Sequence, residues 1–303
     1  MTTATLPTRR SFLKGAVAGA AASAFPRVAL AWSAQEDKRR FVFSPKLGVC
    51  TSLKNASLLK QSGADYLEAG VRWFLVPDKP EEEFARNLSA ARECGLPVPT
   101  ANGFLPGSLK STGPKPNHDG VLKFAETAFR RANAVGLKVI VFGSSGSRTP
   151  PKDFSLKQAE GQFVALLKRM GPLAKPYGVT VALEPLNRKE THFINTVAHG
   201  VRIVRAVGHP NIRLLADIFH MMREEEPPEH IRDAGDLIVH VHIAEKRKRT
   251  APGVDGDDFR PHLRALRDIG YAGRISMECG WKEMSAQLPV AVKTLREQIA
   301  SLD

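Results

Sequence analysis

The sequence predicts an α/β fold in which eight strand–helix units close into a single (β/α)₈ barrel. Short apolar runs typical of strands alternate with longer amphipathic segments typical of helices, and this alternation repeats eight times. That order favours parallel strands covered by helices, and eight units in about 260 residues fit a closed barrel better than an open sheet. No linker rich in Gly, Ser or Pro divides residues 41–303, so we expect them to form one domain.

The expected elements follow one another without long gaps. The strands are residues 46–51, 65–69, 97–102, 138–143, 179–184, 212–217, 238–243 and 274–279. The helices lie near residues 54–62, 81–94, 118–135, 154–175, 195–207, 228–234, 259–269 and 283–301. Glycines stand where left-handed C-caps are expected, at Gly95, Gly136, Gly178 and Gly208. Short polar side chains that can cap helix starts are Asn117 or Asp119, Asp153 and Asn195.

An open doubly wound sheet is the structural alternative. It would carry a glycine-rich phosphate turn after an early strand, and residues 142–147 (FGSSGS) are the candidate. This stretch follows the fourth strand and lacks the GxGxxG and GxxxxGK[ST] spacings. We therefore interpret it as a plain strand-to-helix loop.

Composition narrows the class of protein. Hydrophobic residues make up 43 % and charged residues 25 % of the chain, which is ordinary for a globular protein and excludes wholesale disorder. Cys50, Cys94 and Cys279 are too few for a disulfide framework and form no CxxC pair. A thiolate zinc site is therefore not expected.

The first 31 residues have the order of a secretory signal peptide. Arg9, Arg10 and Lys14 precede a small apolar run, and an A-x-A cleavage site ends at Ala31. The run is short and is interrupted by Pro26, so we expect no stable membrane span. Residues 8–14 (TRRSFLK) resemble the twin-arginine export signal, which implies the twin-arginine machinery as a partner and a periplasmic location. Residues 32–40 would be a short segment before the domain.

The basic surplus does not point to nucleic acid. The formal charge is +13 for the whole chain and +9 without the first 31 residues. The basic residues are scattered, and the one dense run, residues 246–249 (KRKR), directly follows a strand. A solvated face or a loop that binds an anionic ligand explains it better than a nucleic-acid surface.

Polar side chains gather at the ends of the last four strands. These are Glu184, Asp217, His242 and Glu278. Catalytic groups of such barrels lie at the carboxyl ends of the strands, so these residues should share one rim. Three carboxylates held together repel one another unless a cation or proton lies among them. A divalent metal is the simplest neutraliser, and this oxygen-rich set favours Mn²⁺, Mg²⁺ or Co²⁺, with Zn²⁺ or Fe²⁺ left open.

The motifs around these residues resemble a known family. The fifth strand gives LEPLNR (183–188) with Glu190 beyond it, and the sixth gives DIFH (217–220). The seventh gives HVH (240–242) with Glu245 three residues later, and the eighth gives Met-Glu at 277–278. Together they resemble the sugar phosphate isomerase/epimerase superfamily, the xylose isomerase-like TIM barrels. The pattern is most similar to the ketose 3-epimerases and hydroxypyruvate isomerase.

The resemblance implies roles for individual residues. Glu184, Asp217, His242 and Glu278 would be the metal ligands, and Glu184 and Glu278 would also be the acid/base pair. The substrate contacts would be Glu190, His220 and an arginine three residues before Pro-Gly, which is Arg249 here, with Arg247 as the alternative. Among the other polar residues, Glu68 and Asn102 would face the pocket. His240 has the same strand parity as His242, so both should point inward, with His240 one layer below.

The sequence therefore predicts an enzyme of the isomerase class. We expect a divalent-metal-dependent sugar epimerase or isomerase that removes a proton next to a carbonyl and passes through an enediolate. The alternative on the same barrel is an exported keto-sugar glycoside lyase or hydrolase. An endonuclease IV-like protein is disfavoured because that chemistry needs many histidines, and a non-catalytic sugar-binding barrel because both acid/base carboxylates are present. The partner is a small carbohydrate, and the sugar, the metal and a homodimer are left open.

Overall fold

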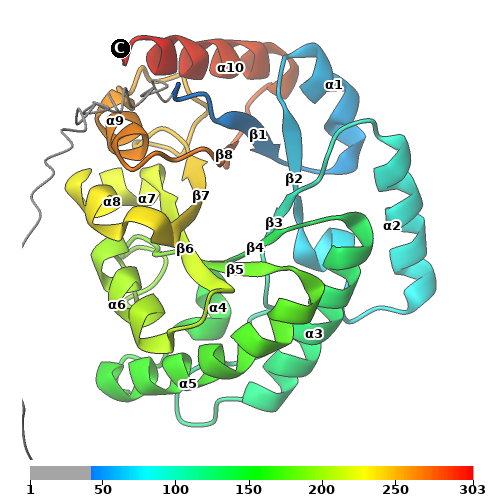
Figure 1. The fold of residues 1–303 in the computed structure, drawn as a ribbon, viewed down its shortest axis with the longest axis vertical. Coiled ribbons are helices and arrows are strands. Elements are labelled where there is room, and N and C mark those ends of the chain that lie inside the picture. The colour runs from blue at the N-terminus through cyan, green and yellow to red at the C-terminus, as the bar shows by residue number, and fades with distance from the viewer. Residues whose placement is uncertain (1–41, 303) are drawn as a thin grey trace, which may run out of the picture. The chain divides into compact units, whose positions relative to one another are not determined.

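A computed structural model describes residues 42–302. Within that range, eight parallel strands close into a barrel in chain order, which confirms the predicted fold (Figure 1). The barrel closes where β1 pairs with β8. The strands are β1 (Lys46–Cys50), β2 (Tyr66–Gly70), β3 (Thr100–Asn102), β4 (Val139–Phe142), β5 (Thr180–Leu183), β6 (Ile212–Asp217), β7 (Ile238–Ile243) and β8 (Arg274–Met277).

Helices surround the barrel, and each predicted helix has a counterpart. They are α1 (Ala56–Gln61), α2 (Glu81–Glu93), α3 (His118–Val135), α4 (Ser145–Arg148), α5 (Leu156–Ala174), α6 (Val197–Val207), α7 (Ile218–Arg223), α8 (Glu229–Ala234), α9 (Arg260–Asp268) and α10 (Met284–Ala300). Short turns are η1 (Leu53–Asn55), the π-turn η2 (Val71–Leu75), η3 (Lys175–Tyr177) and η4 (Gly235–Leu237). The sequence did not predict η2, α4 and α7, and each begins close to the carboxyl end of a strand.

Helix caps explain most of the boundaries. Asn117 caps α3, because its side chain accepts a hydrogen bond from the Gly120 amide at 2.9 Å. Gly136 and Gly208 end α3 and α6 in the left-handed conformation that glycine adopts without strain.

Two of the expected N-caps are wrong by one or two residues. Ser155, not Asp153, caps α5 by accepting from the Gln158 amide. Thr196, not Asn195, caps α6. The Asn195 side chain instead donates to carbonyls within the loop after β5, so its amide is used to hold that loop.

The FGSSGS stretch is more ordered than the plain loop that we expected. After β4 the backbone turns at Ser144, which has a φ of 32°, and the next four residues form α4. The Ser144 carbonyl accepts from the amides of Ser147 and Arg148, and both of those side chains are buried. A short helix therefore lies at the rim where the sequence showed only turn-forming residues.

The apolar core has two parts. The larger part lies between the sheet and the helices, and a small cluster of Val141, Ala182 and Leu215 has the strand parity of Glu184 and Asp217 and so fills the barrel interior. Gly48 leaves room inside for the ring of Tyr66, since a Cβ at Gly48 would lie 2.2 Å from it. Above this level the interior becomes polar.

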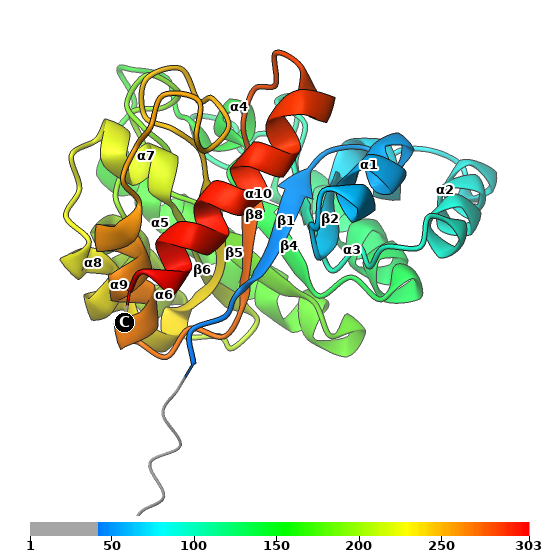
Figure 2. The ribbon, with the colours of Figure 1, turned by 90° about the horizontal axis from the view of Figure 1, so that it is seen from above.

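The carboxyl ends of the strands define one rim of the barrel. In Figure 2 the β1 arrow points to the upper end of the view, where α4 and the loop between β7 and α9 lie. Between residues 42 and 302, no helix is both long and apolar enough to cross a membrane. The predicted signal peptide and the segment 32–40 lie outside the described residues, so that division of the chain stays a prediction.

Candidate active site

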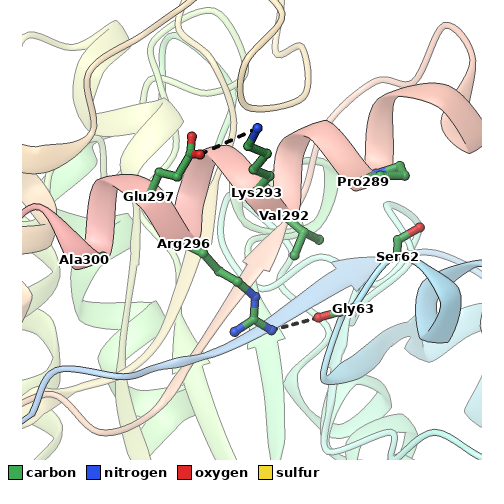
Figure 3. Close-up of a pocket in the computed structure, with 8 residues that line it drawn as sticks. All are labelled: Ser62, Gly63, Pro289, Val292, Lys293, Arg296, Glu297 and Ala300. Carbon is green, nitrogen blue, oxygen red and sulfur yellow. Dashed lines mark hydrogen bonds and ion pairs between the residues drawn. The ribbon is translucent and has the colours of Figure 1, made fainter.

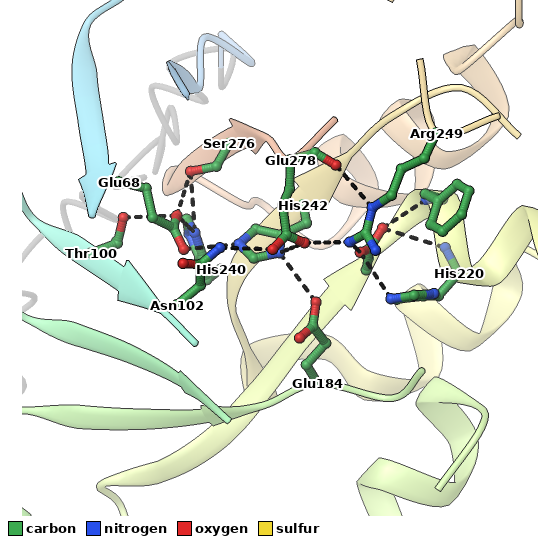
Figure 4. Close-up of polar contacts among 12 residues, drawn as sticks. Glu68, Thr100, Asn102, Glu184, His220, His240, His242, Arg249, Ser276 and Glu278 are labelled. Carbon is green, nitrogen blue, oxygen red and sulfur yellow. Dashed lines mark hydrogen bonds and ion pairs between the residues drawn. The ribbon is translucent and has the colours of Figure 1, made fainter. Parts of the chain in front are cut away.

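The four residues predicted at the strand ends meet at this rim. Glu184 follows β5, Asp217 ends β6, His242 belongs to β7 and Glu278 follows β8. One ligand atom from each lies within 4.8 Å of those from the others. Figure 4 shows His242 beside Glu278, with Glu184 and Arg249 pointing toward them from different sides. The described residues thus contain a site with the geometry to hold a metal ion.

The His242 ring is oriented by carboxylates on both of its nitrogens. Nε2 lies 3.0 Å from Glu68 Oε1. Nδ1 lies 3.1 Å from Glu184 Oε1 and 3.0 Å from Glu278 Oε2. Burial alone would lower the pKa of His242, but Glu68 and Glu278 outweigh it and raise that pKa well above its ordinary value. With Glu68 holding Nε2, Nδ1 is the atom that faces the site.

Glu68 organises the layer beneath the site. Its fully buried carboxylate lies 2.6 Å from His240 Nε2 and accepts from Thr100 Oγ1 at 2.9 Å and from Ser276 Oγ. Burial raises the pKa of Glu68, but His240 and His242 outweigh burial, and the pKa lies well below its usual range. His240 therefore lies one layer below His242, as the strand parity predicts.

Asp217 is held by the helix that it starts. One carboxylate oxygen, Oδ1, accepts from the amides of Phe219 at 2.8 Å and His220 at 3.3 Å. Because α7 begins directly after β6, this cap fixes the side chain at the rim. The other oxygen, Oδ2, stays directed at the site, 3.4 Å from both His220 Nε2 and Arg249 Nη2.

Glu184 and Glu278 lie in different environments. Glu184 Oε2 lies close to the backbone of Gly143, so that a Cβ at Gly143 would come within 2.1 Å of it. Burial raises the pKa of Glu184. Glu278 accepts from Asn102 Nδ2 at 2.7 Å. Burial opposes ionisation of Glu278 too, but His242 and Arg249 outweigh it and lower its pKa to about 2. Two carboxyls whose pKa values are displaced in opposite directions are typical of acid/base pairs.

Arg249 is the basic residue that turns into the site. Its Nη2 donates to Glu278 and lies 3.4 Å from Asp217 Oδ2, and its Nη1 lies 3.3 Å from Glu190. The guanidinium also lies 4.7 Å from the centroid of the Phe219 ring. Arg247, the alternative, is 68 % exposed and pairs with Asp255 on the loop surface.

A buried carboxylate fixes the loop that carries Arg249. Glu245 is fully buried and accepts from the backbone amides of Gly253 at 2.8 Å and Gly256 at 2.9 Å. It also accepts from Thr250 Oγ1 at 3.0 Å. The loop is thereby closed around one acidic side chain, and Arg249 itself has a φ of 54°.

Glu190 and His220 complete the group. Asn187 joins them, because its side chain donates to Glu190 Oε1 at 3.1 Å and lies 2.7 Å from His220 Nδ1. That contact leaves His220 Nε2 directed toward Asp217. The structure thus brings every predicted site residue to one rim.

Comparisons with known proteins identify the family of this barrel. The family model of the xylose isomerase-like TIM barrel matches residues 56–302. The chain belongs to this family. A model of the twin-arginine pathway signal sequence matches residues 7–26, and this signal indicates export to the periplasm.

Characterised relatives of this barrel are sugar epimerases, which are enzymes of the isomerase class. A D-psicose 3-epimerase from Agrobacterium fabrum is 30 % identical over 71 % of this chain and 75 % of its own length. A 3-dehydro-D-guloside 4-epimerase from Escherichia coli is 32 % identical over 63 % of this chain and 74 % of its own. The crystal structure of a 3-keto-D-glucoside 4-epimerase from E. coli, in its apo form, superposes with a TM-score of 0.70 at 26 % identity, covering 84 % of this chain and 100 % of that one.

A buried cation that the sequence did not predict lies beside the site. Arg148, the last residue of α4, is fully buried, and none of its guanidinium nitrogens has a hydrogen-bond partner among the described residues. Burial lowers the pKa of Arg148 to about 10, although Glu184 and Glu190 act in the opposite direction. Nothing in a Ser- and Gly-rich stretch signals that its arginine turns inward.

Two hollows differ in what they could bind. A cavity of about 630 Å³ opens beside Glu278 and Asn102 and runs along the ends of β1 and β2. A second hollow, of about 440 Å³, lies between α10 and the end of α1 (Figure 3). In the second, Lys293 pairs with Glu297 and Arg296 donates to the Gly63 carbonyl, and none of the site residues takes part. The cavity beside Glu278 is therefore the one that adjoins the candidate site.

Proposed function

We propose that this barrel is a metal-dependent sugar epimerase that acts by removing and returning a proton next to a carbonyl. The observation that carries the proposal is the convergence of two carboxylates from different strands, Glu184 and Glu278, on one imidazole nitrogen. Groups that approach from different strands can lie on the two faces of a bound sugar. Epimerisation needs that two-sided arrangement, because the proton leaves one face of the carbon and returns on the other.

The donor set fits a divalent ion. Glu184, Asp217, His242 and Glu278 offer three carboxylate oxygens and Nδ1 within 4.8 Å, and Glu68 fixes the imidazole from behind. Hard oxygen donors with one imidazole suit Mn²⁺ best among the common ions, and Mg²⁺, Co²⁺, Zn²⁺ or Fe²⁺ are the alternatives. When bound, the ion supplies Lewis acidity that polarises a carbonyl oxygen.

The chain's own residues supply the binding and the proton transfer. Arg249, His220 and Glu190 present a guanidinium, an imidazole and a carboxylate to the hydroxyl groups of a sugar. One side chain of the Glu184–Glu278 pair, as a carboxylate, takes the proton from the carbon next to the carbonyl. The electron pair of that C–H bond forms a C=C bond, and the π pair of the carbonyl moves onto its oxygen to give an enediolate. The other, as a carboxylic acid, gives a proton to the same carbon from the opposite face, and the carbonyl re-forms.

Solvent isotope incorporation tests this function. The protein is loaded with Mn²⁺ and incubated in D₂O with a panel of free ketoses, keto-sugars and their glycosides, and the products are followed by NMR. We expect deuterium at the carbon next to the carbonyl of the epimerised product. Conversion without solvent deuterium would overturn the proposal in favour of hydride transfer or direct hydrolysis, and release of an aglycone would identify elimination on the same site.

A further inference from the structure

The cavity beside Glu278 is larger than a single sugar requires. Pockets of about 300–1,000 Å³ hold ligands of drug size, and this one measures about 630 Å³. Its inner end is formed by Glu278 and Asn102. Its walls are mostly apolar or uncharged, including Leu53, Ala69, Phe74 and Ala90. A free hexose held at the acidic residues would leave much of this apolar wall in contact with water.

An exposed tryptophan lies at this cavity. Trp73 belongs to the π-turn η2, directly after β2, and is 77 % exposed. Its indole lies against the backbone of Gly70, where a Cβ would come within 2.7 Å of Cδ1. Large aromatic side chains that are left exposed beside a cavity are typical of binding surfaces.

The segment that presents Trp73 is held from two helices. Asn87 of α2 donates to the Phe74 carbonyl at 2.9 Å and to the Trp73 carbonyl at 3.3 Å. Arg131 of α3 is buried and donates to the carbonyls of Leu75 and Val76. Val76 is held in the left-handed region at a φ of 43°, which is a strained conformation for a β-branched residue. Trp73 is therefore presented on a fixed platform.

We infer that this cavity is a subsite for a second ring, so that the substrate is a glycoside of a keto-sugar and not a free monosaccharide. The reacting sugar would lie against Glu184 and Glu278, and its aglycone, a further sugar or an aromatic ring, would extend along the apolar wall and stack on Trp73. The inference rests on the proposed function for the position of the reacting ring. The stacked face of a sugar or aromatic ring is apolar, which matches the indole.

The charges that line the cavity do not favour a phosphorylated substituent at this position. The charged residues that line the cavity are Lys54 and Glu278. A phosphate in the cavity would meet one exposed lysine and, at the inner end, a carboxylate that repels it. An uncharged aglycone avoids that repulsion.

The test compares one sugar with and without its aglycone. The probes are 3-keto-glucose and its phenyl glycoside, and the readout is deuterium exchange next to the ketone in D₂O, which precedes both epimerisation and elimination. We expect the phenyl glycoside to have a kcat/KM about tenfold higher or more, the scale of one stacked ring. Equal values, or a preference for the free sugar, would overturn the subsite.

Variants of Trp73 locate the effect. Trp73→Ala should raise the KM of the glycoside and so remove the preference for it, with little change in kcat or in the kinetics of the free sugar. Trp73→Phe should keep most of the preference, because it retains an aromatic ring. Leu156→Ala truncates another exposed apolar side chain, which is 47 % exposed and absent from the cavity lining, and should change neither substrate. A preference that survives Trp73→Ala contradicts the inference. If a second copy of the chain covers Trp73 instead, Trp73→Ala should change the oligomeric mass, measured by light scattering, and keep the preference for the glycoside. That result also contradicts the inference.

Binding without reaction separates this inference from the proposed function. Phenyl β-D-glucoside has no ketone and cannot react, and saturation-transfer NMR reports whether its phenyl protons contact the protein. A phenyl contact that is lost in Trp73→Ala supports the subsite, whether or not any keto-sugar exchanges deuterium. Absence of deuterium exchange would contradict the proposed function alone. Exchange of deuterium without phenyl contact would contradict the subsite alone.

Discussion

The two sides of the barrel rim are built in different ways. On the side of β5 to β8, charged groups lie against one another: Glu184, Asp217, Glu278, His242 and Arg249 are joined by ion pairs, and most are buried. On the side of β1 to β3, the cavity has mostly apolar or uncharged walls, and an exposed Trp73 is presented by a strained turn. Glu278 belongs to both sides, because Asn102 of β3 donates to it and Arg249 pairs with it from the opposite side.

The two sides of the rim are therefore suited to different tasks, proton transfer on one side and substrate choice on the other. Charges held close together in a buried site interact strongly and are suited to moving a proton. An apolar wall carries no reacting group and can only choose what extends from the reacting ring. Changes to the carboxylates of the acid/base pair should therefore affect turnover, and changes on the cavity side should affect the choice of substrate.

The largest effect is expected from the two acid/base candidates. Glu184→Gln and Glu278→Gln should each lower kcat by ~10² or more, the scale of lost general acid–base catalysis. Metal content must be measured in the same samples, because both residues are also proposed ligands. Glu297→Gln, an exposed carboxylate on α10, is the matched control and should leave kcat unchanged. A loss of only a few-fold in both site variants would contradict the division of tasks.

A second prediction separates metal binding from helix capping at Asp217. Asp217→Ala removes both the charge directed at the site and the cap of α7, whereas Asp217→Asn keeps an oxygen for the cap. We expect both variants to lose Mn²⁺ and the rise in thermal stability that saturating Mn²⁺ produces, about 2.7 kcal/mol at a hundredfold excess over Kd. In the absence of metal, only the Ala variant should also lose about 1 kcal/mol of folding stability, because it lacks the helix cap. Wild-type metal content in Asp217→Asn would refute the ligand assignment.

The basic loop provides a matched pair of arginines. Arg249→Ala should raise KM about tenfold or more, as expected for a lost hydrogen bond to a charged group, without changing the metal content. Arg247→Ala removes an exposed ion pair on the same loop and should leave KM unchanged. If both variants behave alike, Arg249 does not contact the substrate.

The smallest effect on activity is expected from a substitution at His262 of α9, outside both sides of the rim. His262 of α9 is buried with neither ring nitrogen hydrogen-bonded, and burial lowers its pKa from 6.5 to about 4. Between those pH values the unfolded chain binds a proton that the folded chain does not. Stability is therefore full above pH 6.5 and falls as the pH drops toward 4, by at most about 3 kcal/mol.

Denaturation of His262→Leu measures that contribution. Its stability should depend less on pH between 6.5 and 4 than that of the wild type, with kinetics unchanged at pH 8. An unchanged slope would assign the acid loss of stability to the carboxylates of the site instead.

The order of the barrel strands could be predicted from the sequence, and so could the strands whose ends carry the candidate site residues. Every observed strand starts within three residues of its predicted position and ends within two, because apolar runs and turn residues are local signals. Glu184, Asp217, His242 and Glu278 could be assigned to one rim because parallel strands in a closed barrel all end on the same side. The short rim elements η2, α4 and α7 carry no such periodicity and were not predicted.

Tertiary structure alone decided what these side chains contact. His240 and Glu68 are 172 residues apart in the chain, and Asn102 and Glu278 are 176 apart. No local pattern predicts such pairs, since they exist only once the barrel has closed. The same holds for Trp73, which is exposed because Asn87 and Arg131, from two helices further along the chain, hold its turn at the edge of the cavity. Periodicity determines which face of an element is buried, but the direction of a side chain on a short rim turn depends on packing between distant segments.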